Sequence, residues 1–142
     1  MSTMRTMILT IGLPASGKST WAKEQLKKEP KRWKRINKDD LRAMLDNSVW
    51  TPENEKVVTY LQEYAVKTAF NYGFDVIVDN THLNRRAVKQ MHALAEQQGN
   101  VNVIEKVFTT DLETCIARDK LRTGNACVGE DVIRGMYNKA QL

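Results

Sequence analysis

The sequence has few cysteines, no long hydrophobic run, no internal repeat and no low-complexity segment. Its two cysteines, Cys115 and Cys127, match no metal-binding spacing such as C-x-x-C, so we expect reduced thiols of the kind found in the cytoplasm. No stretch approaches the roughly 18 to 20 apolar residues that a membrane span requires, and the N-terminus has no signal-peptide hydrophobic region. These absences predict a cytoplasmic protein that makes no contact with a membrane.

What the sequence does contain predicts one folded domain over residues 1–142, because 42% of its residues are hydrophobic. The formal net charge is +5, from 22 basic and 17 acidic residues. Between positions 27 and 38 the basic residues cluster around a single acid, Glu29: these are Lys27, Lys28, Lys31, Arg32, Lys34, Arg35 and Lys38. A cluster of this kind just before a candidate active-site segment is expected to attract a polyanion.

The clearest motif is GLPASGKS, from Gly12 to Ser19, which fits the P-loop pattern G-x-x-x-x-G-K-[ST]. It follows an apolar run and opens a helical stretch, which is the context a phosphate-binding loop needs. Lys18 would reach the outer phosphates, and the Ser19 hydroxyl would bind Mg²⁺. The expected nucleotide-binding residues are Gly12, Pro14, Ala15, Ser16, Gly17, Lys18, Ser19 and Thr20. The motif predicts a protein that binds ATP with Mg²⁺.

Hydrophobic periodicity and capping signals predict an alternation of strands and helices. The expected elements are a strand over 7–11, a helix over 18–28, a short strand over 34–37, a helix over 40–46, a helix from Thr51 to Gly73, a strand over 74–79, a helix from Asn84 to Gly99, a strand over 101–108, a helix from a capping box at Thr110 to about Arg122, and a last helix over 131–139. This order predicts an α/β fold, the P-loop NTPase three-layer αβα sandwich, with a mainly parallel sheet of about four strands and a helical lid near 111–130.

In such a sheet the segments that follow the strands converge on the ligand. One of these segments contains Asp39, Asp40 and Arg42. On a helix, Asp39 and Arg42 project from one face, so the carboxylate is placed to activate a hydroxyl and the arginine to hold a phosphate. The alternatives are that one aspartate only caps the helix, or that the pair is an ordinary surface ion pair.

Two further segments carry candidate groups. Asp79 ends a hydrophobic strand in the manner of a Walker B acid, which positions Mg²⁺ through water, and the alternative is a turn-forming aspartate. Arg118 and Arg122 lie on one helical face before the loop 123–126 and are expected to close over the triphosphate as a lid. The alternative for both arginines is ordinary pairing with Glu113 or Asp119.

The remaining aromatic and imidazole side chains have less specific interpretations. Trp21, Trp33 and Trp50 are expected to pack in the core, and base stacking is the alternative. His82 and His92 have no metal-ligand spacing, so a structural role is expected for both.

Four segments together resemble the kinase domain of bacteriophage polynucleotide 5′-hydroxyl kinases, a branch of the P-loop kinases. They are ILTIGLPASGKSTWA from Ile8 to Ala22, INKDDLR from Ile36 to Arg42, VIVDNTHLN from Val76 to Asn84, and R-x-x-x-R-x-G from Arg118 to Gly124. They occur in the family's order and at similar spacing, from about residue 7 to Tyr137.

The resemblance implies a role for each matching residue. Lys18 and Ser19 resemble the phosphate and Mg²⁺ ligands, Asp39 the general base on the 5′-hydroxyl, and Arg42 the clamp on the first phosphate of the acceptor. By the same resemblance Arg122, assisted by Arg118, binds the donor phosphates, and Asn80 and Thr81 contact the acceptor. The implied partners are 5′-hydroxyl ends of DNA or RNA. No D-x-D-G-T phosphatase motif occurs, so we expect no 3′-phosphatase activity.

Two other functions remain open at this point. A P-loop kinase of a small metabolite, such as a sugar acid or a nucleoside, would share the P-loop, the aspartate and the lid arginines. A nucleotide-dependent binding module that hydrolyses ATP slowly would need no hydroxyl base. The choice between DNA and RNA, between single strands and duplex ends and between ATP and GTP is also open, as is the oligomeric state.

Overall fold

A computed structural model describes residues 3–140 and places strands and helices in alternation over this range. The strands are β1 (Arg5–Ile11), β2 (Trp33–Ile36), β3 (Asp75–Val78) and β4 (Val101–Val107). The helices are α1 (Lys18–Lys28), α2 (Lys38–Asp46), α3 (Pro52–Asn71), α4 (Arg85–Gln98), α5 (Leu112–Lys120), the short 3₁₀ helix η1 (Gly124–Ala126) and α6 (Glu130–Ala140).

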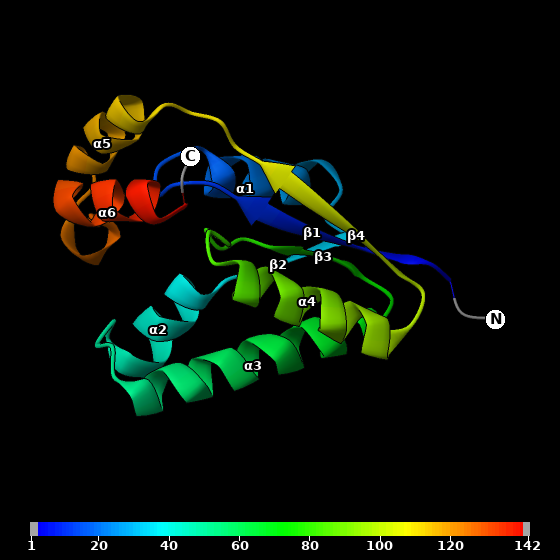
Figure 1. Cartoon of the computed structure of the whole chain (residues 1–142). Coiled ribbons are helices and arrows are strands. Elements are labelled where there is room, and N and C mark those ends of the chain that lie inside the picture. The colour runs from blue at the N-terminus through cyan, green and yellow to red at the C-terminus, as the bar shows by residue number, and fades with distance from the viewer. Residues whose placement is uncertain (1–2, 141–142) are drawn as a thin grey trace.

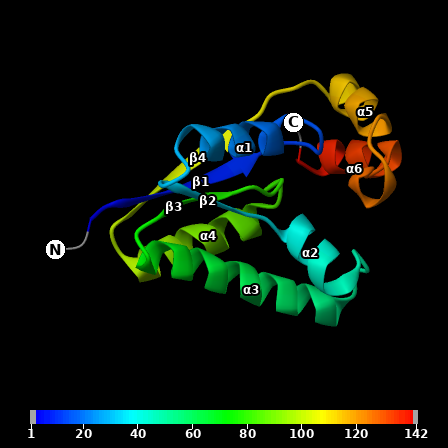
Figure 2. The same ribbon diagram turned by 180° about the vertical axis from the view of Figure 1, so that it is seen from behind.

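All four strands run parallel in the order β2-β3-β1-β4. Helix α1 lies against one face of the sheet and helices α3 and α4 against the other, so the chain forms three layers (Figure 1). Viewed from behind, helices α2, α5 and α6 gather beyond one end of the sheet (Figure 2). The predicted three-layer α/β fold with a parallel sheet is confirmed.

The apolar alternation of β1 explains why both faces are covered. Met7 and Leu9 point to the side where Val66 of α3 and Val88 of α4 pack, whereas Ile8 joins a second cluster on the side of α1. A third apolar cluster connects Leu13, Cys115, Ile116 and Ile133, and it packs α5 and α6 onto the loop after β1.

Side-chain caps begin the helices near the predicted positions. Asn37 caps α2 by accepting from the Asp40 N–H, so neither Asp39 nor Asp40 is the cap. Thr51 and Asn84 cap α3 and α4 as expected. The capping box at Thr110 is wrong, because Asp111 caps α5 by accepting from the Thr114 N–H at 3.0 Å.

The tryptophans divide between the core and the surface. Trp33 is buried beneath α1, and Trp21 packs partly against the same cluster, as predicted. Trp50 contradicts the core prediction, because 62% of its surface is exposed. Among the helices of residues 3–140, none combines the length and the apolar character needed to cross a membrane.

Candidate functional site

A cleft of about 1130 Å³ opens at the carboxyl ends of the strands. Its walls come from the loops after β1, β2 and β3, from α2 and α3, and from the region of α5 and η1. The convergence expected from strand order therefore occurs, and it brings together side chains far apart in the sequence. All the predicted site residues except Gly12 and Ser16 line this cleft; those two lie within the loop itself.

The loop between β1 and α1 curls tightly, which explains its glycines. Gly17 has φ 103°, a left-handed conformation that glycine adopts without strain, and Ala15 also has positive φ at 63°. A Cβ atom at Gly12 would lie 2.8 Å from the Ser16 hydroxyl oxygen and 3.1 Å from Phe108. Gly17, Lys18 and Ser19 at the start of α1 line the cleft, where a helix N-terminus is suited to bind an anion.

Lys18 is buried, and its ammonium group donates to the Leu13 carbonyl at 2.6 Å and to the Ser16 hydroxyl at 3.4 Å. Both partners are neutral, so the charge is not neutralised by a direct ion pair within residues 3–140. Burial lowers the pKa of Lys18 to about 8, and the carboxylates of Asp79 and Asp39 oppose the lowering. A buried cation without a direct counter-ion suits the outer phosphates of a nucleotide.

Helix α5 approaches the P-loop from the other side of the cleft. The Arg118 guanidinium donates to the Ala15 carbonyl at 3.4 Å, and the Thr110 hydroxyl donates to the Ser16 carbonyl at 2.8 Å. Arg122 donates to the Ala126 carbonyl at 3.5 Å, and its charge contributes to the lowered pKa of Lys18. The structure thus gathers Lys18, Arg118 and Arg122 around one space.

The expected alternative for the two arginines, pairing with Glu113 or Asp119, is not what the ion pairs of residues 3–140 show. Glu113 pairs with Arg134 of α6 at 3.0 Å. Asp119 is buried and accepts from the backbone N–H groups of Val128 and Gly129, each at 2.8 Å. Although burial opposes it, these bonds hold the pKa of Asp119 below its usual range. Asp119 thus fixes the loop after Arg122, a role the sequence did not reveal.

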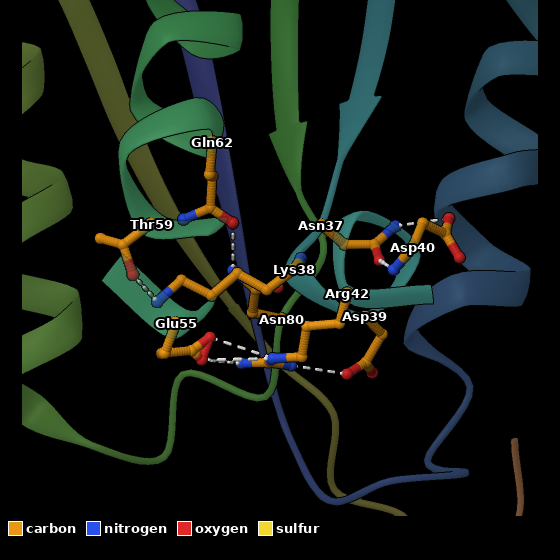
Figure 3. A network of polar contacts seen from close by, with 9 residues as sticks. All are labelled: Asn37, Lys38, Asp39, Asp40, Arg42, Glu55, Thr59, Gln62 and Asn80. Atoms are coloured by element: carbon orange, nitrogen blue, oxygen red, sulfur yellow. Dashed lines mark hydrogen bonds and ion pairs between the residues drawn. The ribbon is translucent and has the colours of Figure 1, made fainter. Parts of the chain in front are cut away.

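On the opposite wall Arg42 stands between two carboxylates (Figure 3). It donates to Asp39 through Nη1 at 2.8 Å and to Glu55 of α3 through Nε at 3.0 Å and Nη2 at 2.8 Å. The Asp39–Arg42 juxtaposition predicted from their spacing is confirmed, whereas Glu55 was missed. Although burial opposes it, Arg42 lowers the pKa of Glu55. Asp39 itself stays open to the cleft, with 93% of its side chain exposed.

A second set of bonds joins this wall to the loop after β3 (Figure 3). The Asn80 carbonyl oxygen of the side chain accepts from the Lys38 backbone N–H at 2.9 Å, and its amide nitrogen donates to Gln62 at 2.8 Å. The Lys38 ammonium donates to Thr59 at 3.0 Å, and burial lowers its pKa. Asn80 therefore braces α2 against α3, while its predicted contact with an acceptor remains a prediction.

The loop after β3 is also fastened to β1. The Gly12 N–H donates to the Thr81 carbonyl at 3.0 Å, and the Thr10 hydroxyl donates to the Asn80 carbonyl at 2.9 Å. The buried ring of His82 donates through Nδ1 to the Thr10 carbonyl at 2.6 Å, in line with the structural role expected for it. Thr81 is thereby held beside the P-loop.

Asp79 lies at the same junction and accepts from the Arg35 guanidinium at 2.8 Å. Its side chain is almost fully buried, and its charge acts on Lys18. Within residues 3–140, no group of three or more His, Cys, Asp or Glu side chains is arranged to hold a metal ion alone. The Ser19 hydroxyl and Asp79 both line the cleft, which fits a Mg²⁺ ion that takes most ligands from phosphate and water.

The basic cluster of the sequence does not act as one surface beside the cleft. Helix α1 starts at the P-loop and runs back along the sheet (Figure 1). Its last turn, which contains Lys27 and Lys28, therefore lies away from the cleft. Arg35 and Lys38 reach the cleft, but they already bond Asp79 and Thr59. Neighbours in sequence are thus spread along the length of the sheet, and the expected attraction of a polyanion by these residues stays a prediction.

Comparison with known proteins identifies similar chains. A protein of Autographa californica nuclear polyhedrosis virus that carries the name bifunctional polynucleotide kinase/RNA ligase is 27% identical over 148 residues, covering 94% of this chain and 20% of that protein. A chain in the solved structure of the Pnkp1/Rnl/Hen1 RNA repair complex matches with a TM-score of 0.86 at 26% identity, covering 99% of this chain and 45% of that chain. The resemblance to polynucleotide kinases is confirmed.

A third protein is similar to this chain in fold alone. The APS kinase CysC of Mycobacterium tuberculosis, solved with AMPPNP and APS, matches with a TM-score of 0.66 at 17% identity, over 84% of this chain and 70% of that chain. This chain spans about a fifth of the viral relative and less than half of the repair-complex chain. The sequence profile of the AAA domain family matches residues 7–141, and the chain therefore belongs to that family.

Proposed function

We propose that this chain transfers the γ-phosphoryl group of ATP to the 5′-hydroxyl end of DNA or RNA in the cytoplasm. The observation that carries the proposal is the arrangement of the cleft. A buried lysine without a direct ion pair lies on one wall, and an exposed carboxylate beside a clamped arginine lies on the other. The viral relative that carries a polynucleotide kinase name supports the choice of a nucleic-acid acceptor.

The donor side is assigned to the P-loop and the lid. Residues 12–20 cradle the phosphates of ATP, and Lys18 moves from the Leu13 carbonyl to the outer phosphates. Arg118 and Arg122 neutralise the charge that grows on the transferred group. When bound, Mg²⁺ would be held by the Ser19 hydroxyl and, through water, by Asp79, and it would withdraw charge from the phosphate oxygens.

The acceptor side is assigned to the wall that faces them. Asp39 takes the proton of the 5′-hydroxyl while the hydroxyl oxygen bonds to the γ-phosphorus and the bond from that phosphorus to the β–γ bridging oxygen breaks. A guanidinium has five N–H donors, and Arg42 uses three of them on Asp39 and Glu55. Two therefore remain to hold the first phosphate of the acceptor. Asn80 and Thr81 complete this wall.

The direct test uses labelled ATP, Mg²⁺ and a pair of oligonucleotides that differ only in whether the 5′ end is a hydroxyl or a phosphate. We expect label to enter the 5′-hydroxyl strand alone. Transfer to a sugar acid or a nucleoside but not to the strand would identify a metabolite kinase. Release of phosphate with no acceptor labelled would identify an ATP-hydrolysing binding module.

Arg42→Ala separates acceptor binding from the rest of the reaction. The variant is expected to raise the acceptor KM while the ATP KM stays near that of the unmodified chain, because Arg42 touches only the acceptor wall. Arg42→Lys is the matched control for charge, since a lysine cannot reproduce the planar fork. An unchanged acceptor KM in Arg42→Ala would remove Arg42 from the clamp.

A further inference from the structure

A shallow hollow of about 460 Å³ lies along α3 beside the cleft, with the side chains of Trp50 and Tyr60 in its lining. Its largest side chains are Trp50 and Tyr60, which are 62% and 67% exposed. The lining is Trp50, Pro52, Glu55, Lys56, Thr59, Tyr60 and Glu63. Two exposed aromatic rings around one hollow are unusual for a surface that binds nothing.

The hollow is continuous with the proposed acceptor wall. Thr59 and Glu63 line both the hollow and the main cleft. Glu55 faces the hollow and also binds Arg42 through two guanidinium nitrogens. The hollow therefore adjoins the part of the cleft wall that carries Arg42.

Trp50 is held in place although it is exposed. It stands between Asn47 and Ser48, both with positive φ, and the Thr51 cap of α3. The Asn54 side chain donates to the Val49 carbonyl at 3.1 Å, which fixes the segment just before Trp50. The Trp50 indole also contributes to the lowered pKa of Glu55, so its N–H side faces that carboxylate. The ring is a pre-oriented platform.

We propose that Trp50 and Tyr60 stack against a nucleobase of the acceptor strand, on the nucleotide that follows the phosphate clamped by Arg42. This inference rests on the proposed function. The ligand is the base and not a second phosphate, because the hollow carries the carboxylates of Glu55 and Glu63 against the single cation of Lys56. A flat, uncharged base can stack on the rings and is not repelled by those carboxylates, whereas a phosphate would be.

The test compares three 5′-hydroxyl acceptors. They are a nucleoside 3′-monophosphate, a tetranucleotide, and the same tetranucleotide with an abasic second residue. The variants are Trp50→Ala and Tyr60→Ala, with Trp50→Phe to retain an aromatic ring and Tyr72→Ala as a control. Tyr72 is a more exposed aromatic at the opposite end of α3.

Loss of one stacking ring is expected to lower kcat/KM for the tetranucleotide about tenfold, a typical cost for one base. Trp50→Ala and the abasic residue remove the same contact, so their effects should not add. The unmodified chain and Trp50→Ala should phosphorylate the nucleoside 3′-monophosphate equally well. On the tetranucleotide, Trp50→Phe should recover most of the kcat/KM that Trp50→Ala loses. Equal loss on all three acceptors, or no loss on the tetranucleotide, would overturn the inference.

A binding measurement separates this inference from the proposed function. The tetranucleotide, without ATP, should quench the tryptophan fluorescence of the unmodified chain more than that of Trp50→Phe, and the abasic strand should remove the difference. Absence of a Trp50-dependent signal overturns the stacking proposal even if the kinase is active. A clear signal in a chain that phosphorylates no strand supports the stacking site and rejects the kinase reaction.

Discussion

Two walls of the cleft are built in different ways: the P-loop wall, residues 12–20, and the α2–α3 wall, which holds Asp39, Arg42, Glu55 and Asn80. The P-loop wall comes from one continuous segment, and its central cation, Lys18, rests on neutral oxygens. The α2–α3 wall joins residues from three parts of the chain, and its central cation, Arg42, is bonded to two carboxylates. One wall therefore holds an unneutralised charge, whereas the other holds a charge that is already compensated.

This difference indicates how each wall treats an anion. Under the proposed function Lys18 gains a counter-ion when a triphosphate binds, so of these two walls we expect the P-loop wall to provide the affinity for nucleotide. Arg42 would give up little of its existing pairing, so we expect the α2–α3 wall to provide orientation more than affinity. Variants on the two walls should therefore fail in different steps of the reaction.

The largest expected effect comes from Asp39→Ala. Loss of the base should lower kcat by about 10² to 10⁴, the usual range for general-base catalysis, while the Kd for ATP stays the same. Asp46→Ala, which removes an acid from the other end of α2, is the control. Steady-state kinetics and nucleotide titration check both quantities. Wild-type turnover in Asp39→Ala would remove Asp39 from the base position.

Glu55→Gln tests whether the reaction depends on the pairing of the Arg42 charge with the Glu55 carboxylate. Arg42 would keep only Asp39 as an ionic partner and would pair with it more tightly, so both the clamp and the base would be disturbed. We expect kcat/KM for the acceptor to fall about 10- to 100-fold, as for the loss of a charged hydrogen bond. Glu53→Gln, which changes an exposed residue two positions earlier in the sequence, is the control. A fall in ATP affinity instead would mean that the two walls are not independent.

The sequence predicted the P-loop wall better than the α2–α3 wall, for a physical reason. The positions of Gly12, Gly17 and Lys18 follow from one short motif, and the Asp39–Arg42 pair follows from helical spacing. The partner Glu55 is thirteen residues from Arg42 and meets it only because α2 packs on α3. Such contacts depend on helix packing, which leaves no local pattern in the sequence.

The same reason explains the wrong predictions. Trp50 was expected in the core because tryptophan is usually buried, but its segment lies at the turn between α2 and α3. The Asp119 anchor was missed because its partners are backbone N–H groups, which any sequence supplies. Threonine is a common helix-capping residue, but the Thr110 hydroxyl donates to the Ser16 carbonyl of the P-loop instead.

Lys18 predicts a pH dependence that belongs to the P-loop wall alone. Its pKa in the folded chain is about 8, below the ordinary value of 10.5, so its charge destabilises the fold below about pH 8. That cost is relieved as the pH rises from about 8 towards 10.5, because the unfolded chain then binds more protons. Bound triphosphate favours the charged form, so the Kd for ATP should rise up to about tenfold per pH unit above pH 8.

Nucleotide titration at pH 7, 8 and 9 measures this dependence. Lys18→Met should bind ATP weakly at every pH and show little change between them. A flat profile for the unmodified chain would mean that the Lys18 ammonium does not carry the binding of the phosphates.

Asp119→Asn tests the loop that follows the lid arginine. An amide presents only one acceptor oxygen, so one of the Val128 and Gly129 N–H groups loses its partner. We expect a loss of about 1 to 3 kcal/mol in the free energy of unfolding, and an ATP KM raised several-fold because Arg122 is less well placed. Asp131→Asn, on the exposed first turn of α6, is the control. Unchanged kinetics with lowered stability would confine Asp119 to a structural role.

The smallest effect is expected from the basic residues at and just after the end of α1, away from the cleft. Lys28 lies ten helical residues beyond Lys18, which corresponds to about 15 Å along α1, and it pairs with Glu24 at 4.0 Å. At physiological ionic strength the Debye length is about 8 Å, so an exposed charge at this distance contributes little to acceptor binding. The double variant Lys28→Ala, Lys31→Ala should therefore change the KM of a short oligonucleotide by less than about twofold. A strong, salt-dependent rise in KM would mean that the acceptor extends along α1, away from the α2–α3 wall, and the comparison between the walls would have to include that helix.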